Sequence, residues 1–157
     1  MNHDCAEIGR FHDLVSSHHG GWMNEPSAAR LLAVSQSFSD VLIGRRLRVT
    51  MVAGRDGHMM PLPNDPDGWV EFGKDGHFAM NDSVNISSGR YQRADGGIRL
   101  GSPVTTAVGY DRRDPARAAL IDAMVAMTDP GIVVSVHVDG DTVGLVAAGH
   151  RIVCTTA

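Results

Sequence analysis

Long apolar runs are missing from this sequence of 157 residues. The longest are about six residues, whereas a membrane-spanning helix needs about 18 or more. The first residues, Met1–Glu7, do not have the pattern of a secretory signal peptide. We therefore expect no transmembrane segment and a cytoplasmic location.

Cysteine is also scarce, with only Cys5 and Cys154, which lie near opposite ends of the chain. Small secreted proteins are held by an even set of closely spaced cysteines, and this sequence has no such set. We expect both thiols to be unpaired and the protein to fold without a disulfide.

An excess of positive charge is absent as well. Fourteen Lys and Arg residues stand against 18 Asp and Glu residues, which gives a net charge of -4. The one compact basic group is Arg45, Arg46 and Arg48, too few to neutralise a nucleic-acid backbone. We expect no nucleic-acid partner.

Catalytic and cofactor-binding motifs are absent as well. The sequence has no Gly-x-Ser-x-Gly, His-Glu-x-x-His, Cys-x-x-Cys or Gly-rich phosphate loop. His12 and His19 would share a helix face, but no carboxylate or Cys stands at a matching ligand spacing. We therefore expect no catalytic residue, cofactor-binding residue, metal site or cofactor. Four acidic residues could converge for acid/base chemistry, although solvated turns explain them better: Glu71, Asp75, Asp82 and Asp95.

What the sequence does contain is enough apolar material for a core, 43% of its residues. A chain of this length buries about 70% of its unfolded surface in one domain. Residues 1–43 have helical spacing, with expected helices at 5–15 after Asp4 and at 28–41 before a stop at Gly44. We predict that residues 1–43 are a helical or partly disordered extension and that residues 44–157 are the domain.

From Gly44 onward the apolar residues alternate. Leu47, Val49 and Met51 are expected on one face of a strand, and the Pro-rich residues 54–68 are expected to form a surface loop. Further strands are predicted at 69–72, 77–80, 85–93, 98–100, 104–108, 133–138 and 150–154.

Two hairpins have a testable register. A three-residue loop, Lys74–Gly76, pairs Phe72 with Phe78 and so keeps apolar partners together. In the last hairpin, a turn at Asp139–Gly140 pairs Val136 with Val143 and also aligns Val134 with Leu145 and Ile132 with Ala147. His137 falls on the opposite face, where we expect a solvated side chain.

One strong helix interrupts the strands. Asp114 is a good N-cap, Pro115 suits the first helical position, and Asp129–Gly131 stops the helix. Its apolar stripe is formed by Leu120, Ala123, Met124 and Met127. The predicted fold is α+β: a curved antiparallel sheet or open barrel of about six to eight strands with this helix packed across its open side.

Residues 44–157 resemble the META domain (HslJ-like) family. In that family a strand ending in Phe is followed by Asp-Gly, then Gly-Cys-Asn, then Gly-x-Tyr. The same order is filled here by Phe72, Asp75–Gly76, Ser83–Asn85 and Gly89–Tyr91, and the Thr-rich segment 105–110 follows.

Two departures from the family pattern stand out. Val84 and Tyr110 occupy the positions of the family's paired cysteines, and Ser83 replaces the Gly before the first cysteine. The usual Trp of the opening strand is Leu47. We hypothesise that Val84 and Tyr110 pack against each other in place of the bridge that the resemblance implies.

The resemblance implies a bacterial, stress-associated protein without enzymatic activity, although many family members are attached to the envelope. We predict a binding or interaction module whose partner is an unidentified protein or small molecule. Two alternatives stay open: a lipocalin-like carrier of a small apolar ligand, and an uncharacterised hydrolase-type enzyme.

Overall fold

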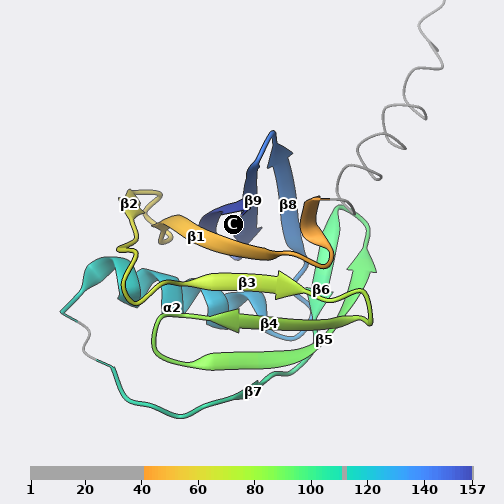
Figure 1. Ribbon diagram of the computed structural model, residues 1–157, viewed down its shortest axis with the longest axis horizontal. Coiled ribbons are helices and arrows are strands. Elements are labelled where there is room, and N and C mark those ends of the chain that lie inside the picture. The colour runs from red at the N-terminus through yellow and green to blue at the C-terminus, as the bar shows by residue number, and fades with distance from the viewer. Residues whose placement is uncertain (1–40, 111–112, 157) are drawn as a thin grey trace, which may run out of the picture. The chain divides into compact units, whose positions relative to one another are not determined.

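Antiparallel strands and one helix make up the part of the chain described by the computed structural model, residues 41–110 and 113–156 (Figure 1). In chain order the elements are β1 (Arg46–Ala53), β2 (Met59–Pro61), β3 (Trp69–Phe72), β4 (His77–Asn81), β5 (Ile86–Ala94), β6 (Gly97–Leu100), β7 (Val104–Thr105), α2 (Pro115–Met127), β8 (Val134–Asp139), β9 (Thr142–Ala147) and β10 (His150–Thr156).

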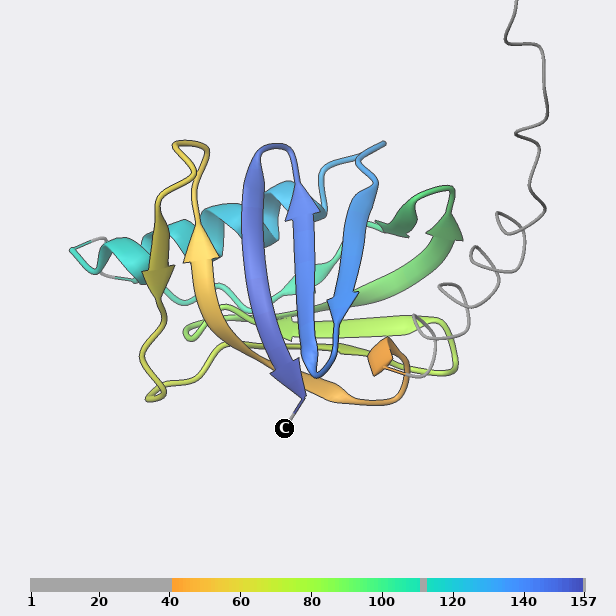
Figure 2. The same ribbon diagram turned by 90° about the horizontal axis from the view of Figure 1, so that it is seen from above.

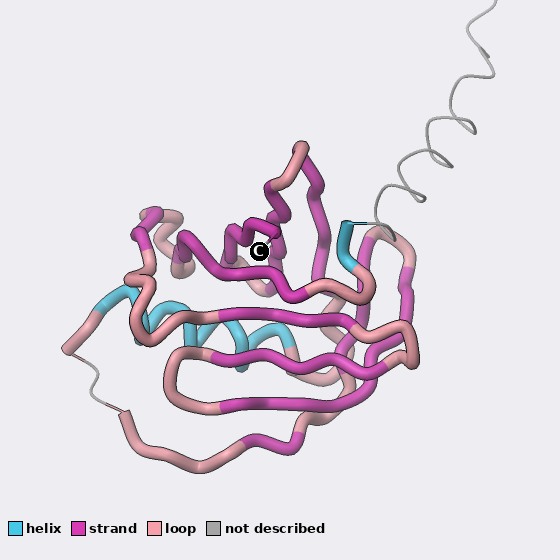
Figure 3. Tube along the Cα trace, viewed as in Figure 1, coloured by secondary structure: helices cyan, strands magenta, loops and turns pink. Residues whose placement is uncertain are grey.

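Eight of the strands close into a barrel. Neighbours run in the order β10-β9-β8-β6-β5-β4-β3-β1, and a further pairing of β10 with β1 joins the two ends. β2 pairs with the end of β1 and β7 pairs with β5, so these two short strands lie off the closed path (Figure 3). The predicted antiparallel sheet with one helix is confirmed, and the sheet is closed where an open one was expected.

A β-bulge in β1 changes which residues face the core. The register of β1 against β10 shifts between Val49 and Met51, which leaves Thr50 as the extra residue. The Thr50 hydroxyl donates to the Val153 carbonyl at 3.2 Å. Beyond the bulge Val52 is fully buried and Met51 is only half-buried. The expectation that Met51 continues the apolar face was therefore wrong.

The hairpin of β3 and β4 has the predicted register. Val70 pairs with Met80 and Phe72 with Phe78, and all four side chains are buried. Gly76 has a φ of +81°, the left-handed conformation that the three-residue loop requires. Local sequence fixed this pairing because a shift by one residue would expose every apolar side chain.

The predicted register of the β8–β9 hairpin was wrong by two residues. Val136 pairs with Leu145, and Val143 pairs with Val138, so Leu145 is not the partner of Val134. Ile132 precedes β8 and is not part of this ladder. The turn consists of Gly140, with a φ of +57°, and Asp141. Because side chains alternate with a period of two, both registers place the same residues inside. His137 is exposed, as expected.

The Pro-rich loop and the strand before α2 also differ from expectation. The loop contains β2, an edge strand that pairs Val52 with Met60 and ends at Pro61. Proline is tolerated there because an edge strand does not need every backbone N–H. The strand expected over 104–108 extends only over Val104–Thr105.

Helix α2 begins as predicted. The Asp114 carboxylate accepts hydrogen bonds from the backbone N–H groups of Ala116 and Arg117 at 3.1 and 3.2 Å, and Pro115 is the first helical residue. The helix lies against β1, β9 and β10, as Figure 2 shows from above. All four residues of the predicted stripe are buried, together with Ala116, Ile121 and Ala126.

One continuous hydrophobic core fills the space enclosed by the barrel and α2. Its largest fully buried side chains come from the strands, from α2 and from Leu42, which precedes β1: Phe72, Phe78, Leu42, Leu47, Ile98, Leu120, Met127, Leu145 and Ile152. They contact one another as a single cluster. An eight-stranded barrel has an interior that side chains can just fill.

Several predictions lie outside the described residues: the helix at 5–15, most of the helix at 28–41, Cys5, and the pair His12 and His19. The division of the chain at residues 43 and 44 stays a prediction. Gly44 has the positive φ expected of a helix stop, +78°. Within the described part of the chain, no helix has the length and apolar character to cross a membrane.

Cys154 is a free and fully buried thiol on β10. Burial raises the pKa of this thiol from 9.0 to about 12, because the apolar surroundings disfavour the thiolate. The thiol is therefore a core residue without nucleophilic character.

Truncation of the helix face should test the shared core. Leu120→Ala should lower the free energy of unfolding by about 2–5 kcal/mol, because it leaves a cavity in the barrel. Val125→Ala, at an exposed position of the same helix, should change it by no more than about 0.5 kcal/mol. Urea unfolding measures both changes in free energy. Equal effects of the two substitutions would contradict the packing of Leu120 in the core.

The buried thiol should make stability depend on alkaline pH. Above pH 9 the unfolded chain loses the Cys154 proton while the native state keeps it up to about pH 12. Its stabilising contribution is complete below pH 9 and should fall by up to about 1.4 kcal/mol per pH unit above that. In a Cys5→Ser background, urea unfolding from pH 8 to 10.5 should show this slope relative to a Cys154→Val variant. Equal slopes for the two proteins would contradict a raised pKa at Cys154.

Candidate functional site

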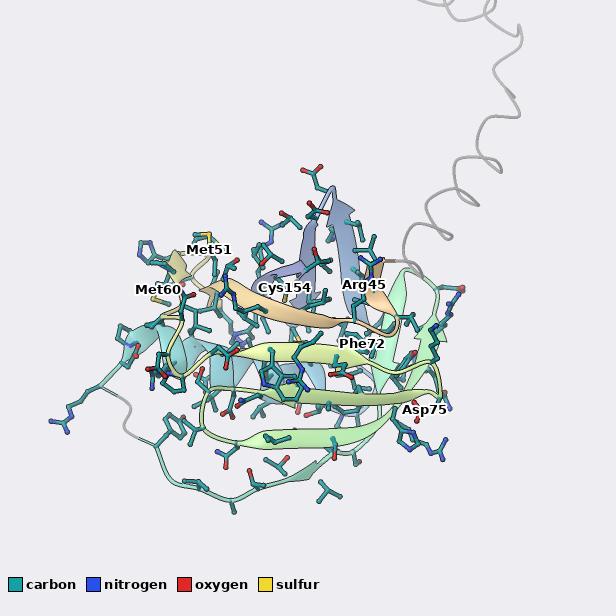
Figure 4. All side chains as sticks on the ribbon, in the orientation of Figure 1. Arg45, Met51, Met60, Phe72, Asp75 and Cys154 are labelled. Carbon is teal, nitrogen blue, oxygen red and sulfur yellow. The ribbon has the colours of Figure 1, made fainter. Side chains whose placement is uncertain are left out.

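A groove of about 760 Å³ runs along α2, between this helix and the segment that joins β1 to β2. Small helix residues, Ala118, Ala119 and Ala126, form part of its wall, and Val125 stands exposed at its side. Met60 of β2 adds a second apolar element. Figure 4 places Met60 at the β2 end of the molecule, far from Phe72 and Asp75. The apolar wall can contact the hydrocarbon part of a ligand.

Charged side chains from two segments also line the groove. Arg55 and Asp56 belong to the turn between β1 and β2, whereas Asp122 lies on α2 and Asp129 just beyond it. One Asp56 carboxylate oxygen accepts a hydrogen bond from the backbone N–H of His58 at 3.1 Å. Three carboxylates therefore face one guanidinium around this groove.

His150 is the buried polar residue of the groove. It is the first residue of β10, is only 7% exposed, and lines the groove. Its Nδ1 is buried and has no hydrogen-bond partner within the described residues. Such an orphan ring nitrogen costs about 1–3 kcal/mol. The tight turn before it uses two positive φ values, +48° at Ala148 and +84° at Gly149.

Barrel closure brings the two sides of the groove together. Ala53 at the end of β1 pairs with Arg151 near the start of β10. The residues that continue these strands, Gly54 and His150, therefore line the same groove although they are far apart in sequence. Sequence analysis missed both, because no local pattern links these two segments. The orphan His150 is a signal that only the fold reveals.

A second region of interest is the tight turn between β4 and β5. Ser83 has a φ of +77°, a left-handed conformation that is costly for a residue with a Cβ. Asp82 is buried and accepts hydrogen bonds from the N–H groups of Val84 and Asn85 at 2.9 and 2.6 Å. The expectation that Asp82 is solvated was wrong, since its carboxylate replaces backbone hydrogen bonds inside this turn.

Asn85 joins this turn to the segment before α2. Its side-chain oxygen accepts from the Val108 N–H at 2.7 Å, and its Nδ2 donates to the Val108 carbonyl at 3.1 Å. Val84 and Tyr110, the two positions of the missing cysteines, line one hollow of about 420 Å³. The two positions therefore lie in the same neighbourhood, and their direct packing stays a hypothesis.

The other acidic candidates lie at the surface, each in its own surroundings. Asp75 bonds to the His77 ring at 3.0 Å, and hydrogen bonds from His77, first from its backbone N–H, lower the pKa of this exposed carboxyl. Glu71 pairs with Arg46 at 3.1 Å on the outer surface, and Asp95 is exposed. Across the described parts of the chain, no group of three His, Cys, Asp or Glu side chains is arranged to hold a metal ion.

Comparison with known proteins gives a fold but no family. No known protein family and no curated protein sequence matches this chain. The NMR structure of a protein from Burkholderia xenovorans is similar, with a TM-score of 0.58, 16% identity and coverage of 77% of this chain and 87% of that chain. A second NMR structure has a TM-score of 0.53 and 12% identity over 74% and 92% of the two chains. These two likenesses show a shared fold.

A crystal structure of a DUF4847 family protein from Bacteroides vulgatus is a more distant match. Its TM-score is 0.47 and its identity 14%, over 74% of this chain and 95% of that chain.

The conformation of Ser83 should make Ser83→Gly a stabilising change. Glycine adopts the positive φ without strain and removes a buried hydroxyl that has no partner among the described residues. We expect a gain of about 1 kcal/mol in the free energy of unfolding. Ser88→Gly, at an exposed β5 position without a positive φ, should instead lose about 0.5–1 kcal/mol. Urea unfolding measures the free energy of unfolding of both variants. A lower value for Ser83→Gly than for the unsubstituted protein would contradict the proposed strain at Ser83.

Proposed function

We propose that this protein is a non-enzymatic binding module whose barrel is a scaffold and whose binding site is the groove along α2. The observation that carries this proposal is the groove's orphan side chain, His150, which is 7% exposed and has an unpartnered Nδ1. About 90% or more of buried polar groups in folded proteins have a hydrogen-bond partner. We propose that a bound ligand is the missing partner and that the ring turns on binding to bring the buried Nδ1 to the groove.

A filled interior favours this proposal over a lipocalin-like carrier. A carrier holds its ligand inside the barrel, where it needs an apolar space of several hundred cubic ångströms. Here Phe72, Phe78 and the helix residues Leu120 and Met127 meet in one buried cluster inside. The groove along α2 lies outside this cluster and already has the volume of a small-molecule site.

The composition of the groove favours binding over catalysis. Hydrolase-type acyl transfer commonly uses a Ser, Cys or Thr nucleophile beside a base, and the lining that the structure describes contains none of these three residue types. Cys154 is buried with a raised pKa, which removes the one described thiol from consideration. We therefore propose that the protein is not an enzyme.

Membership of the META domain family is a further part of the proposal. The family has Gly at the position of Ser83, and the positive φ found there is the conformation that glycine favours. The positions of the family's paired cysteines, Val84 and Tyr110, share one hollow. A role in stress responses follows from this resemblance alone and is proposed on that basis.

Blocking the groove should abolish binding without unfolding the barrel. In NMR titrations with a library of small fragments, binding fragments should shift the amide signals of Gly54, Ala118 and Val125. Val125→Trp, at a 58% exposed position in the groove, should remove these shifts, and Val108→Trp, at a 57% exposed position outside it, should not. Fragments that shift signals of Phe78 and Leu145 would instead support the carrier.

A further inference from the structure

We infer that the groove along α2 binds a small organic cation, an amine that carries an apolar body. This inference rests on the proposed function and adds the chemical class of the ligand. Three features of the groove point to it: its excess of carboxylates, the end of the helix beside it, and the orphan ring nitrogen of His150.

Charge is the first feature. Asp56, Asp122 and Asp129 line the groove and Arg55 is its one cation among the described lining residues, so the side chains carry a surplus of two negative charges. The three carboxylates come from both walls, the β1–β2 turn and the helix. An ammonium group placed between the walls is attracted by both, whereas a carboxylate ligand is attracted by Arg55 alone.

The direction of α2 adds to this potential. The groove follows α2 from its first residue, Pro115, to Asp129, two residues beyond its last residue, and both carboxylates on this wall, Asp122 and Asp129, lie toward the C-terminal end. The aligned peptide dipoles give the C-terminal end of a helix a partial negative charge, which cations usually neutralise. The last turn of α2 has no basic residue to do so. A bound cation fills that role.

The ring of His150 favours a ligand that carries an N–H donor. In the tautomer protonated at Nε2, Nδ1 is an acceptor, and it has no described donor. A protonated amine carries up to three N–H groups, so it can bond to a groove carboxylate and, once the His150 ring turns to bring the buried Nδ1 to the groove, to that nitrogen as well. Met60, Ala119 and Val125 then offer apolar contacts to the body of the same molecule.

The test compares three molecules of one shape and different charge: 4-phenylbutylamine, 4-phenylbutanol and 4-phenylbutyrate. Their dissociation constants for the full chain are measured by NMR titration at pH 7 and low salt. We expect the amine to bind about tenfold more tightly than the alcohol, which is about 1.4 kcal/mol, and the butyrate to bind most weakly. Raising the salt concentration should reduce this preference, because the groove is open to solvent.

A matched pair of variants assigns the effect to the groove. D122N/D129N removes two exposed carboxylates from the groove and should reduce amine affinity to that of the alcohol. D139N/D141N makes the same change in net charge at two exposed positions of the β8–β9 turn and should leave amine affinity unchanged. Equal losses in both variants would show an effect of net charge alone and overturn the site.

The outcomes separate this inference from the proposed function. If the alcohol binds in the groove as tightly as the amine, or the butyrate binds more tightly, the cation inference fails while the groove remains a binding site. If none of the three molecules shifts the groove signals and the fragment library also fails to do so, both proposals fail.

Discussion

Pairing between β1 and β10 is the constraint on which the rest of the structure depends. It joins β1 to β10, the last strand, so it closes the eight-stranded sheet into a barrel and leaves only short strands such as β2 at an edge. The bulge at Thr50 lets the pairing continue while it turns Val52 into the core. The same pairing sets Gly54 beside His150, and so the groove exists only when the barrel is closed.

The interior and the outer surface of the closed barrel have different roles. Its interior is occupied by side chains from the strands and from α2, which gives stability and leaves the surface free for recognition. The helix serves both sides, because Leu120 and Met127 point into the core whereas Asp122 and Val125 are exposed. A single helix thereby links the stability of the fold to the shape of the groove.

Short-range features were predictable from the sequence and long-range ones were not. The β3–β4 register and the cap at Asp114 depend on residues within about ten positions of one another, and both were predicted correctly. The β8–β9 register was missed because two registers satisfy the same alternation. Barrel closure pairs strands about 100 residues apart, and a single sequence carries no pairing signal over that distance. The unpartnered state of the His150 ring is likewise visible only in the folded chain.

Xenon binding followed by NMR tests the central claim, that the barrel is filled and that recognition takes place outside it. Xenon enters empty apolar cavities in proteins and shifts the signals of the methyl groups that line them. We predict that xenon pressure leaves the methyl signals of Leu47, Leu145 and Ile152 unshifted. Saturable shifts at these core residues would reveal an empty space inside the barrel and would contradict the account.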